Sequence, residues 1–193
     1  MFRWTDDMIR FMADAADKTD FHRRLASELL PWLHPDDTVC DAGCGLGYLS
    51  LALAPHVRHI TAAERDAAAL AVLERELAAR HIENVTPLCG THGVDAACCR
   101  LSELGIPYQL KRTAFRFDQP FRSWEDARRF FEIYRRRDDA SLITDELLRQ
   151  RLEATGNGEF PWRLPSVRPA GIIAFDALKI QDTLHHEAMM KLS

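Results

Sequence analysis

The sequence predicts an α/β protein with a mostly parallel sheet and helices on both faces. An apolar strand at residues 38–42 runs into a glycine-rich turn and then into a short helix that Pro55 stops. Two further strand patterns, at residues 59–63 and 84–88, flank an alanine-rich helix at residues 66–80. This β-α-β-α-β order implies parallel strands that are joined by right-handed crossovers.

Two helices are expected before the first strand. Thr5 can cap a helix over residues 5–17, whose early Asp residues suit its positive end. A second helix is expected from about Asp20, and Pro31 kinks or ends it. Its apolar stripe is Phe21, Leu25, Leu29 and Leu33. The pair either packs on the sheet or forms a lid over the glycine turn, and both interpretations stay open.

After residue 90 the alternation stops. The patterns indicate helices at residues 94–104, 124–137, 145–153 and 182–191, and strands at residues 108–117 and 171–175. The two strands are expected to form an antiparallel pair. We find no internal repeat or linker, so a single domain is the simplest organisation.

Length, charge and cysteine usage limit the function classes. A chain of 193 residues suits one domain. Its net charge of −4 gives no general reason to expect nucleic acid or an anionic membrane as partner. There is neither a run of about 18 apolar residues nor a signal-peptide pattern, which favours a cytoplasmic location. The odd count of five cysteines indicates reduced, structural thiols, and we expect no metal site.

The glycine turn predicts a nucleotide-like ligand. Gly43, Gly45 and Gly47 alternate, so the backbone can turn tightly and approach a ligand closely. Glu64 follows about 20 residues later, at the end of the second strand, where a carboxylate can accept hydrogen bonds from ribose hydroxyls. The alternative for Glu64 is a solvated strand end.

The stretch from Val39 to Gly47 resembles the first motif of class I S-adenosylmethionine-dependent methyltransferases, acidic-x-Gly-x-Gly-x-Gly, and the resemblance is specific over residues 38–88. The acidic Asp41 and the glycine spacing separate it from the NAD-binding pattern G-x-G-x-x-G. The resemblance implies a Rossmann-like fold with S-adenosylmethionine as cofactor and Glu64 on its ribose. The implied cofactor-binding residues are Asp41, Ala42, Gly43, Cys44, Gly45, Gly47, Glu64 and Arg65.

The sequence departs from this family after the third strand. The family has two more βα units there, and a βαβ unit needs roughly 30 residues. Between Leu88 and Gly105 there is room for one helix, so the central strands four and five are absent. Three outcomes follow: a compact five-stranded sheet in which the first strand pairs with residues 171–175, a homodimer that completes the sheet, or an internally shortened enzyme.

Few residues suggest the acceptor or the chemistry. His92 is a candidate general base and His22 a weaker one, although a surface or structural role is commoner for each. Thr91 or His92 could contact the adenine. Aromatic residues could line an acceptor pocket, although a place in the core is commoner; these are Trp4, Phe115, Trp124 and Trp162. A proline-rich aromatic motif of the N-P-P-Y type is absent, so methylation of a base amino group has no support.

The leading hypothesis is a methyltransferase that uses S-adenosylmethionine on a small-molecule acceptor, without nucleic acid or membrane partners. The alternatives are a non-catalytic S-adenosylmethionine-binding relative and an NAD-dependent oxidoreductase. The single domain 1–193 would comprise an N-terminal helical segment (1–37), a donor-binding half (38–90) and a segment of closing strands with a helical insertion (91–193).

Overall fold

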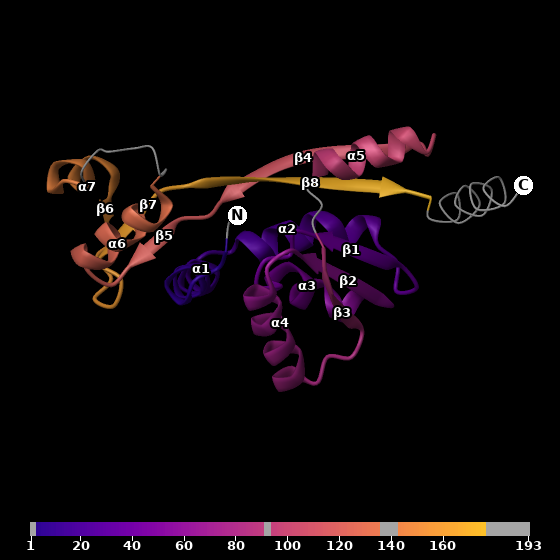
Figure 1. The fold of residues 1–193 in the computed structure, drawn as a ribbon, viewed down its shortest axis with the longest axis horizontal. Helices are drawn as coiled ribbons and strands as arrows, with labels where there is room; N and C mark the ends of the chain where they lie inside the picture. Colours follow the sequence, from indigo (N-terminus) through magenta and orange to yellow (C-terminus); the bar gives the residue numbers. More distant parts are fainter. Residues whose placement is uncertain (1–2, 91–93, 136–142, 177–193) are drawn as a thin grey trace, which may run out of the picture.

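The computed structural model describes residues 3–90, 94–135 and 143–176. Figure 1 shows an elongated molecule, in which a long two-stranded ribbon runs along the upper part. A parallel βα half lies beneath one part of this ribbon, and a small lobe of short strands and two helices lies at its other end. None of the helices in the described part of the chain is long and apolar enough to cross a bilayer.

The two N-terminal helices form as predicted. Helix α1 (Asp6–Lys18) is capped by Thr5, whose hydroxyl accepts the N–H of Met8 at 3.3 Å. Helix α2 (Phe21–Leu29) continues into a 3-10 turn, η1 (Leu30–Trp32), which contains Pro31. The α-helix therefore ends just before Pro31, which has no N–H to continue its hydrogen bonds.

The βα half confirms the predicted parallel order. Its elements are β1 (Thr38–Ala42), α3 (Tyr48–Leu53), η2 (Ala54–His56), β2 (His59–Glu64), α4 (Ala67–Arg80) and β3 (Val85–Cys89). The strands lie in the order β1-β2-β3 and are parallel, with Thr38 opposite His59 and Ile60 opposite Val85. This arrangement is that of a Rossmann-like fold.

The core of this half lies on one face of the sheet. Leu53, Ile60 and Leu73 are fully buried there, between the strands and helices α3 and α4. The residues that alternate with them on the outer strands are exposed; these are Thr38, Cys40, Ala42, Thr86 and Leu88. Among the described residues the helices of this half therefore cover one face, whereas the fold class predicts helices on both.

The closing strands form a ribbon of their own. Strand β4 (Tyr108–Arg116) pairs antiparallel with β8 (Val167–Phe175), from Tyr108 opposite Phe175 to Arg116 opposite Val167. The predicted antiparallel pair is confirmed, but the compact five-stranded sheet does not form, because β1 pairs with β2 alone within the described chain.

Packing explains why the ribbon stays apart from β1. Phe21 and Leu25 of α2 pack with Phe117 and Ile172, so helix α2 occupies the apolar face of the ribbon. Helix α5 (Val94–Glu103) covers β8 from another side, and Val94 lies so close to Gly171 that any larger residue there would clash with it. The ribbon thus buries its side chains against helices rather than in a sheet.

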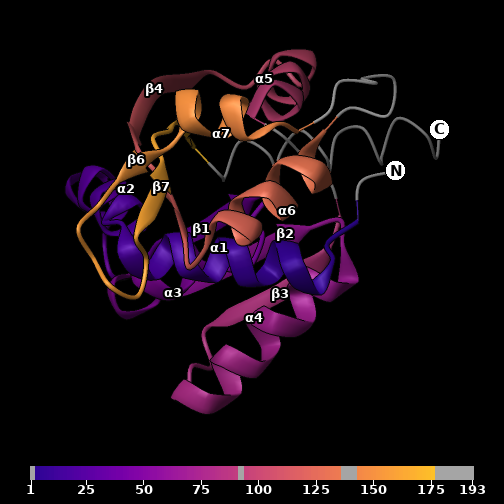
Figure 2. The same ribbon diagram turned by 90° about the vertical axis from the view of Figure 1, so that its left-hand side faces the viewer.

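The lobe at the end of the ribbon was only partly predicted. Helices α6 (Trp124–Tyr134) and α7 (Asp145–Arg151) were expected, although each ends earlier than predicted. The short strands were not expected: β5 (Gln119–Phe121), β6 (Glu153–Ala154) and β7 (Trp162–Leu164), in the order β5-β7-β6. Phe121 and Leu148 are fully buried there beside Phe11 of α1, which lies alongside α6 in Figure 2. The helix predicted at residues 182–191 lies outside the described residues.

Candidate functional site

The glycine turn between β1 and α3 has left-handed backbone at alternate positions. The φ angles are +85° at Gly43, +56° at Gly45 and +82° at Gly47. A Cβ on Gly47 would lie 2.3 Å from Cδ1 of Leu73, so this glycine lets the turn pack against α4. A Cβ on Gly43 would meet nothing within 4 Å, so this part of the turn faces open space.

The backbone N–H groups of the turn are used inside the protein. Those of Gly43 and Cys44 both donate to the carbonyl of Ala63, at 2.8 and 3.0 Å. The N–H of Gly45 donates to Glu64 at 3.1 Å, and that of Gly47 to the carbonyl of Cys44 at 2.9 Å. A dinucleotide turn, by contrast, directs backbone N–H groups at a diphosphate. These four groups already have their acceptors.

Glu64 is buried at the end of β2 and ties the turn to the start of α4. Its Oε1 accepts the N–H groups of Arg65 and Asp66, at 2.9 and 3.2 Å, and its Oε2 accepts that of Gly45. A carboxylate has about four acceptor sites. Glu64 therefore keeps about one site for a ligand hydroxyl without giving up a bond to the protein.

Asp41 is the second carboxylate of the turn. Its Oδ2 accepts the hydroxyl proton of the fully buried Ser50, at 2.7 Å. Burial raises the pKa of Asp41 and the charge of Glu64 adds to this rise, while the Ser50 hydrogen bond opposes it. Burial, followed by the charges of Asp41 and Glu64, also raises the pKa of the Cys44 thiol to about 12, so this thiol is neutral.

These features give the turn a negative electrostatic character. The charge of Glu64 contributes to the raised pKa of Asp41, and both carboxylates contribute to the raised pKa of Cys44, so both act on the same small region. A positively charged ligand would relieve this repulsion, whereas a diphosphate would add to it. The site can therefore hold a cation beside a polar group that carries hydroxyls.

The structure brings most of the residues of the predicted cofactor site together. Asp41, Cys44 and Glu64 surround the three glycines, and the exposed Ala42 and Arg65 flank them. Their roles toward a cofactor stay predictions. Thr91 and His92, the candidates for the adenine contact and the general base, lie outside the described residues.

His22, the weaker candidate base, packs within a group of rings. Its ring centroid lies 5.0 Å from that of Phe21, 5.3 Å from Tyr48 and 5.6 Å from Phe117. Burial, and then the charge of Arg168, lowers the pKa of His22 to about 4. The imidazole is therefore neutral at physiological pH, and its surroundings are those of a packed side chain.

Two residues at the turn, Ser50 and Asp66, were not singled out by the sequence, and a third, Trp4, was named only as a possible residue of an acceptor pocket. Ser50 binds Asp41, Asp66 caps α4 through a bond from the N–H of Ala68 at 2.9 Å, and Trp4 lies against Gly45. Asp66 could have been found, because an acidic residue before an alanine-rich helix is a cap signal. Nothing local to Trp4 indicates that it reaches a turn so far along the chain.

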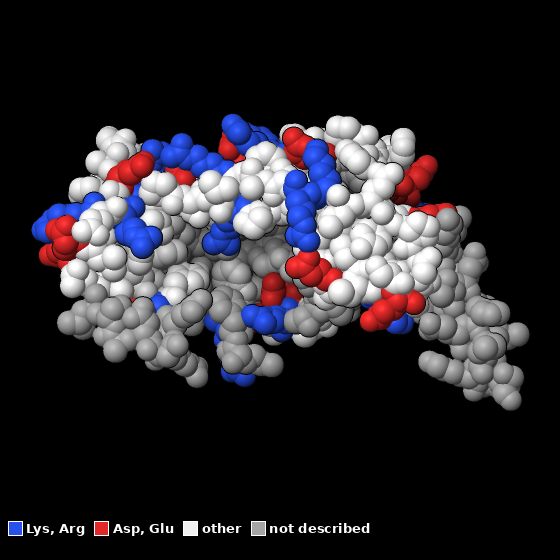
Figure 3. Space-filling model, turned by 90° about the horizontal axis from the view of Figure 1, so that it is seen from above, with Lys and Arg blue, Asp and Glu red and all other residues white. Residues whose placement is uncertain are grey.

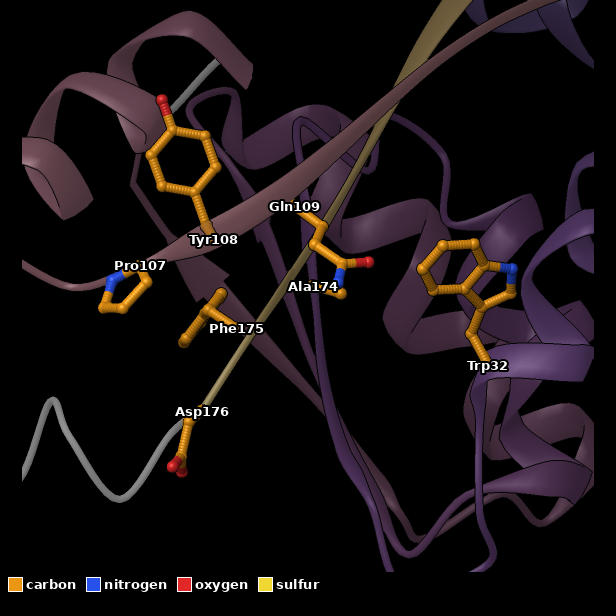
Figure 4. A pocket seen from close by; sticks show the side chains of 7 residues that line it. All are labelled: Trp32, Pro107, Tyr108, Gln109, Ala174, Phe175 and Asp176. Atoms are coloured by element: carbon orange, nitrogen blue, oxygen red, sulfur yellow. The ribbon is translucent and has the colours of Figure 1, made fainter.

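A separate hollow of about 400 Å³ lies at the far end of the ribbon (Figure 4). Trp32 of η1 faces it from one side, and residues of the ribbon ends line the rest. These are Pro107, Tyr108, Gln109, Ala174, Phe175 and Asp176. No residue of the glycine turn lines this hollow, so it is a different place from the candidate site.

Comparisons with known proteins agree with the resemblance. Residues 14–94 match the family model described as methyltransferase small domain, which is less than half of the chain. A 32-residue segment is 66% identical to ribosomal RNA small subunit methyltransferase A of Thermobifida fusca (strain YX), and it spans 17% of this chain and 11% of that protein. The class I methyltransferase-like fold is therefore confirmed. The matched residues are those that contain β1 to β3.

Two solved structures overlap loosely with the chain. The YcgJ protein from Bacillus subtilis is 10% identical with a TM-score of 0.45, over 81% of this chain and 100% of that one. An rRNA methylase from Streptococcus thermophilus is 18% identical with a TM-score of 0.39, over 78% of this chain and 96% of that one.

One prediction about partners is wrong. The sequence led us to expect no nucleic acid, but the curated relative that matches over 32 residues is named as a ribosomal RNA methyltransferase. The error has a physical reason, because a net charge of −4 describes the whole chain and not its individual faces. Figure 3 shows Lys and Arg side chains spread over the ribbon side of the molecule, with Asp and Glu among them.

Proposed function

We propose that this protein is an S-adenosylmethionine-dependent methyltransferase that binds its donor at the glycine turn. The observation that carries the proposal is the pair of carboxylates, Asp41 and Glu64, at a turn with open space above Gly43. S-adenosylmethionine carries a sulfonium and an ammonium group, so it suits a negative site, and its ribose offers hydroxyls to the remaining acceptor site of Glu64.

The same features disfavour NAD. The N–H groups of Gly43, Cys44, Gly45 and Gly47 already have acceptors within the protein, which leaves little for a diphosphate. Methyl transfer from a sulfonium needs chiefly alignment of the acceptor, the methyl group and the leaving sulfur. A donor site that is rigidly tied together by backbone bonds fits that requirement.

For the acceptor we propose an RNA. The support is the name of the relative that matches over 32 residues, together with the basic side chains of the ribbon. On β4 and β8 these are Lys111, Arg112, Arg116 and Arg168. Three of them are paired, with Glu28, Asp95 and Asp118 respectively.

Arg168 differs from the other three basic residues of the ribbon. Its guanidinium lies 4.7 Å from the ring centroid of Phe117, and no carboxylate of the described residues pairs with it. A phosphate could bind there without breaking an ion pair, and such contacts weaken steeply with salt. Arg168→Ala should reduce RNA affinity and lower the salt dependence of binding by about one phosphate contact.

Calorimetry with S-adenosylmethionine, its demethylated product S-adenosylhomocysteine and NAD tests the donor. We expect the first two to bind and NAD to fail, and Glu64→Gln to weaken both of the adenosyl ligands. Asp36→Asn, an exposed change outside the turn, is the matched control. If neither adenosyl ligand binds at millimolar concentration, the proposal is wrong.

Transfer is tested with donor labelled in its methyl group and bacterial small-subunit ribosomal RNA. Label should appear in the RNA and be released by ribonuclease, and Asp41→Asn should reduce its rate. Label that stays acid-insoluble after ribonuclease treatment would point to another acceptor and overturn the RNA assignment.

A second candidate is a donor-binding protein without turnover. The observation that favours it is the edge of the sheet, because β1 has β2 as its one partner strand within the described chain. This candidate predicts donor binding with no transfer to any RNA. We also propose that residues 1–193 form one domain, and that its five free thiols reflect a cytoplasmic setting.

A further inference from the structure

The segment before helix α1 reaches across to the glycine turn. The backbone N–H of Trp4 donates to Oδ2 of Asp66 at 2.8 Å, although the two residues are 62 positions apart. The indole atom Cζ2 of Trp4 lies 3.6 Å from the place that a Cβ on Gly45 would take. A Cβ there would be in ordinary van der Waals contact with the indole, so the indole lies beside Gly45 of the turn.

Both ends of this contact are held in place. Asp66 accepts Trp4 through one oxygen and the α4 cap bond from Ala68 through the other, while its own N–H donates to Glu64. On the other side, Thr5 caps α1 immediately after Trp4. The backbone of Trp4 is therefore fixed by the starts of two helices, and it is linked through Asp66 to the carboxylate of Glu64.

The indole of Trp4 is half-buried beside the glycine turn, where it can affect a ligand in two ways. It adds apolar surface beside a turn whose other groups are carboxylates and backbone. The face of an indole also attracts cations, an effect that is strongest where water is excluded. An adenosyl sulfonium would bring both an apolar body and a positive charge to this surface.

We propose that Trp4 forms a wall of the donor site and contacts the bound S-adenosylmethionine. This rests on the proposed function, because it needs the donor to lie at the glycine turn. The N-terminal segment then serves as part of the binding site, and Asp66 acts as a positioning residue that holds the indole over Gly45 through the backbone of Trp4.

The test compares donor affinity by calorimetry in the wild-type chain, Trp4→Ala, Trp4→Phe and Asp66→Ala. Trp4→Ala should weaken S-adenosylmethionine roughly threefold to thirtyfold, as loss of one aromatic wall and its attraction for a cation predicts. Trp4→Phe should recover part of this loss. Asp66→Ala should weaken the donor in the same direction, since the indole is no longer held.

Trp32→Phe is the matched control, because this exposed tryptophan belongs to η1 and lines the hollow at the other end of the molecule. Its affinity for the donor should equal that of the wild type. Intrinsic fluorescence gives a readout that a purely structural role would not move. The spectral change on adding S-adenosylhomocysteine should persist in Trp32→Phe and be lost in Trp4→Phe.

The outcomes distinguish a failure of the role of Trp4 from a failure of the proposed donor site at the glycine turn. Wild-type affinity in Trp4→Ala, or tighter binding because the indole had blocked the site, overturns the role of Trp4 while the donor assignment stands. A melting temperature of free Trp4→Ala near that of the wild type shows that the effect is not unfolding. If the wild-type chain binds neither adenosyl ligand, it is the proposed function that fails.

Discussion

The parallel half and the ribbon half of this chain are built by opposite means. In the parallel half each strand pairs with the next strand along the chain, and the turn that joins β1 to α3 carries the candidate site. In the ribbon half, β4 pairs with β8 although all the elements of the lobe lie between them along the chain. Short connections along the chain thus determine where the residues of the candidate site lie. The ribbon, which is proposed to bind the acceptor, depends instead on contacts between segments that are distant in the sequence.

Helix α1 joins these two regions. Its Phe11 lies in the core of the lobe, its Ala15 packs beneath the ribbon, and the residue two before its start contacts the glycine turn. A helix that contributes to all three places makes it costly for one region to unfold alone. The parallel half and the ribbon half should therefore unfold together, although they are built differently.

Phe121→Ala should have the largest effect. The ring is fully buried and makes edge contacts with Phe11 and Phe130, so its loss should cost about 3–5 kcal/mol. Leu53→Ala in the parallel half is the matched change, with an expected cost of about 2–5 kcal/mol. Urea unfolding followed by both circular dichroism and fluorescence should give one coincident transition in each variant. Two separated transitions in Phe121→Ala would show that the lobe is an independent unit.

Gly47→Ala should be the next most damaging change. It combines a left-handed φ with a contact to Leu73 that is too short for any Cβ, at a total cost of about 2–5 kcal/mol. Gly43→Ala has a similar φ but open space around it, so it should cost only about 1–2 kcal/mol. The free energies of unfolding of the two variants measure this difference. Equal values would mean that the turn does not pack on α4 as described.

The contrast between the halves also explains which parts of the structure could be predicted. The turn was predictable because Asp41, Gly43 and Glu64 act within two consecutive βα units, where sequence spacing fixes spatial position. The start of β8 was predicted four residues too late, and Pro169 lies in the part of the strand that was missed. A two-stranded ribbon consists of edges only, so Pro169 can lie where its missing N–H needs no partner.

The remaining errors share a cause in tertiary contacts. The strands β5, β6 and β7 have two or three residues each, too few for a readable alternation, and they form around the buried Phe121. The position of Trp4 depends on a bond to Asp66 that no local pattern encodes. The ribbon stayed apart from β1 because helix α2 competes for its apolar face, an outcome that depends on packing and not on propensity.

Asp41→Asn should give a moderate effect on stability whose size depends on pH. Burial raises the pKa of Asp41 above its ordinary value, so the folded protein binds this proton more tightly than the unfolded chain does. The free energy of unfolding then falls as the pH rises through the raised pKa, by about 1.4 kcal/mol for each unit by which folding raises the pKa. The asparagine variant avoids this loss, and its amide oxygen can still accept from Ser50.

Urea titrations from pH 4 to pH 8 test this expectation. The free protein with Asp41→Asn should be more stable than the wild type at pH 8, and the advantage should shrink as the pH falls and the wild-type carboxyl takes up its proton. Donor affinity should fall in the same variant, because a charge that disfavours the empty site favours a cationic ligand. Asp36→Asn should show neither trend. A variant that is less stable at every pH would contradict the conclusion that burial disfavours the charged form of Asp41.

The smallest effect is expected at the ion pair that links α1 to α6. Arg10 donates two hydrogen bonds to Asp126, at 3.1 and 2.6 Å, and its side chain is 38% exposed. Solvent screening limits the coupling energy of this pair to about 0.5–1 kcal/mol. The Arg80–Glu76 pair within α4 is the comparison, and its coupling energy should be about 0.3–0.5 kcal/mol. A double-mutant cycle with Arg10→Met and Asp126→Asn, repeated at high salt, measures it. Because this pair crosses between the regions, a coupling no greater than that of the pair within α4 would mean that the junction at α1 depends on apolar packing alone.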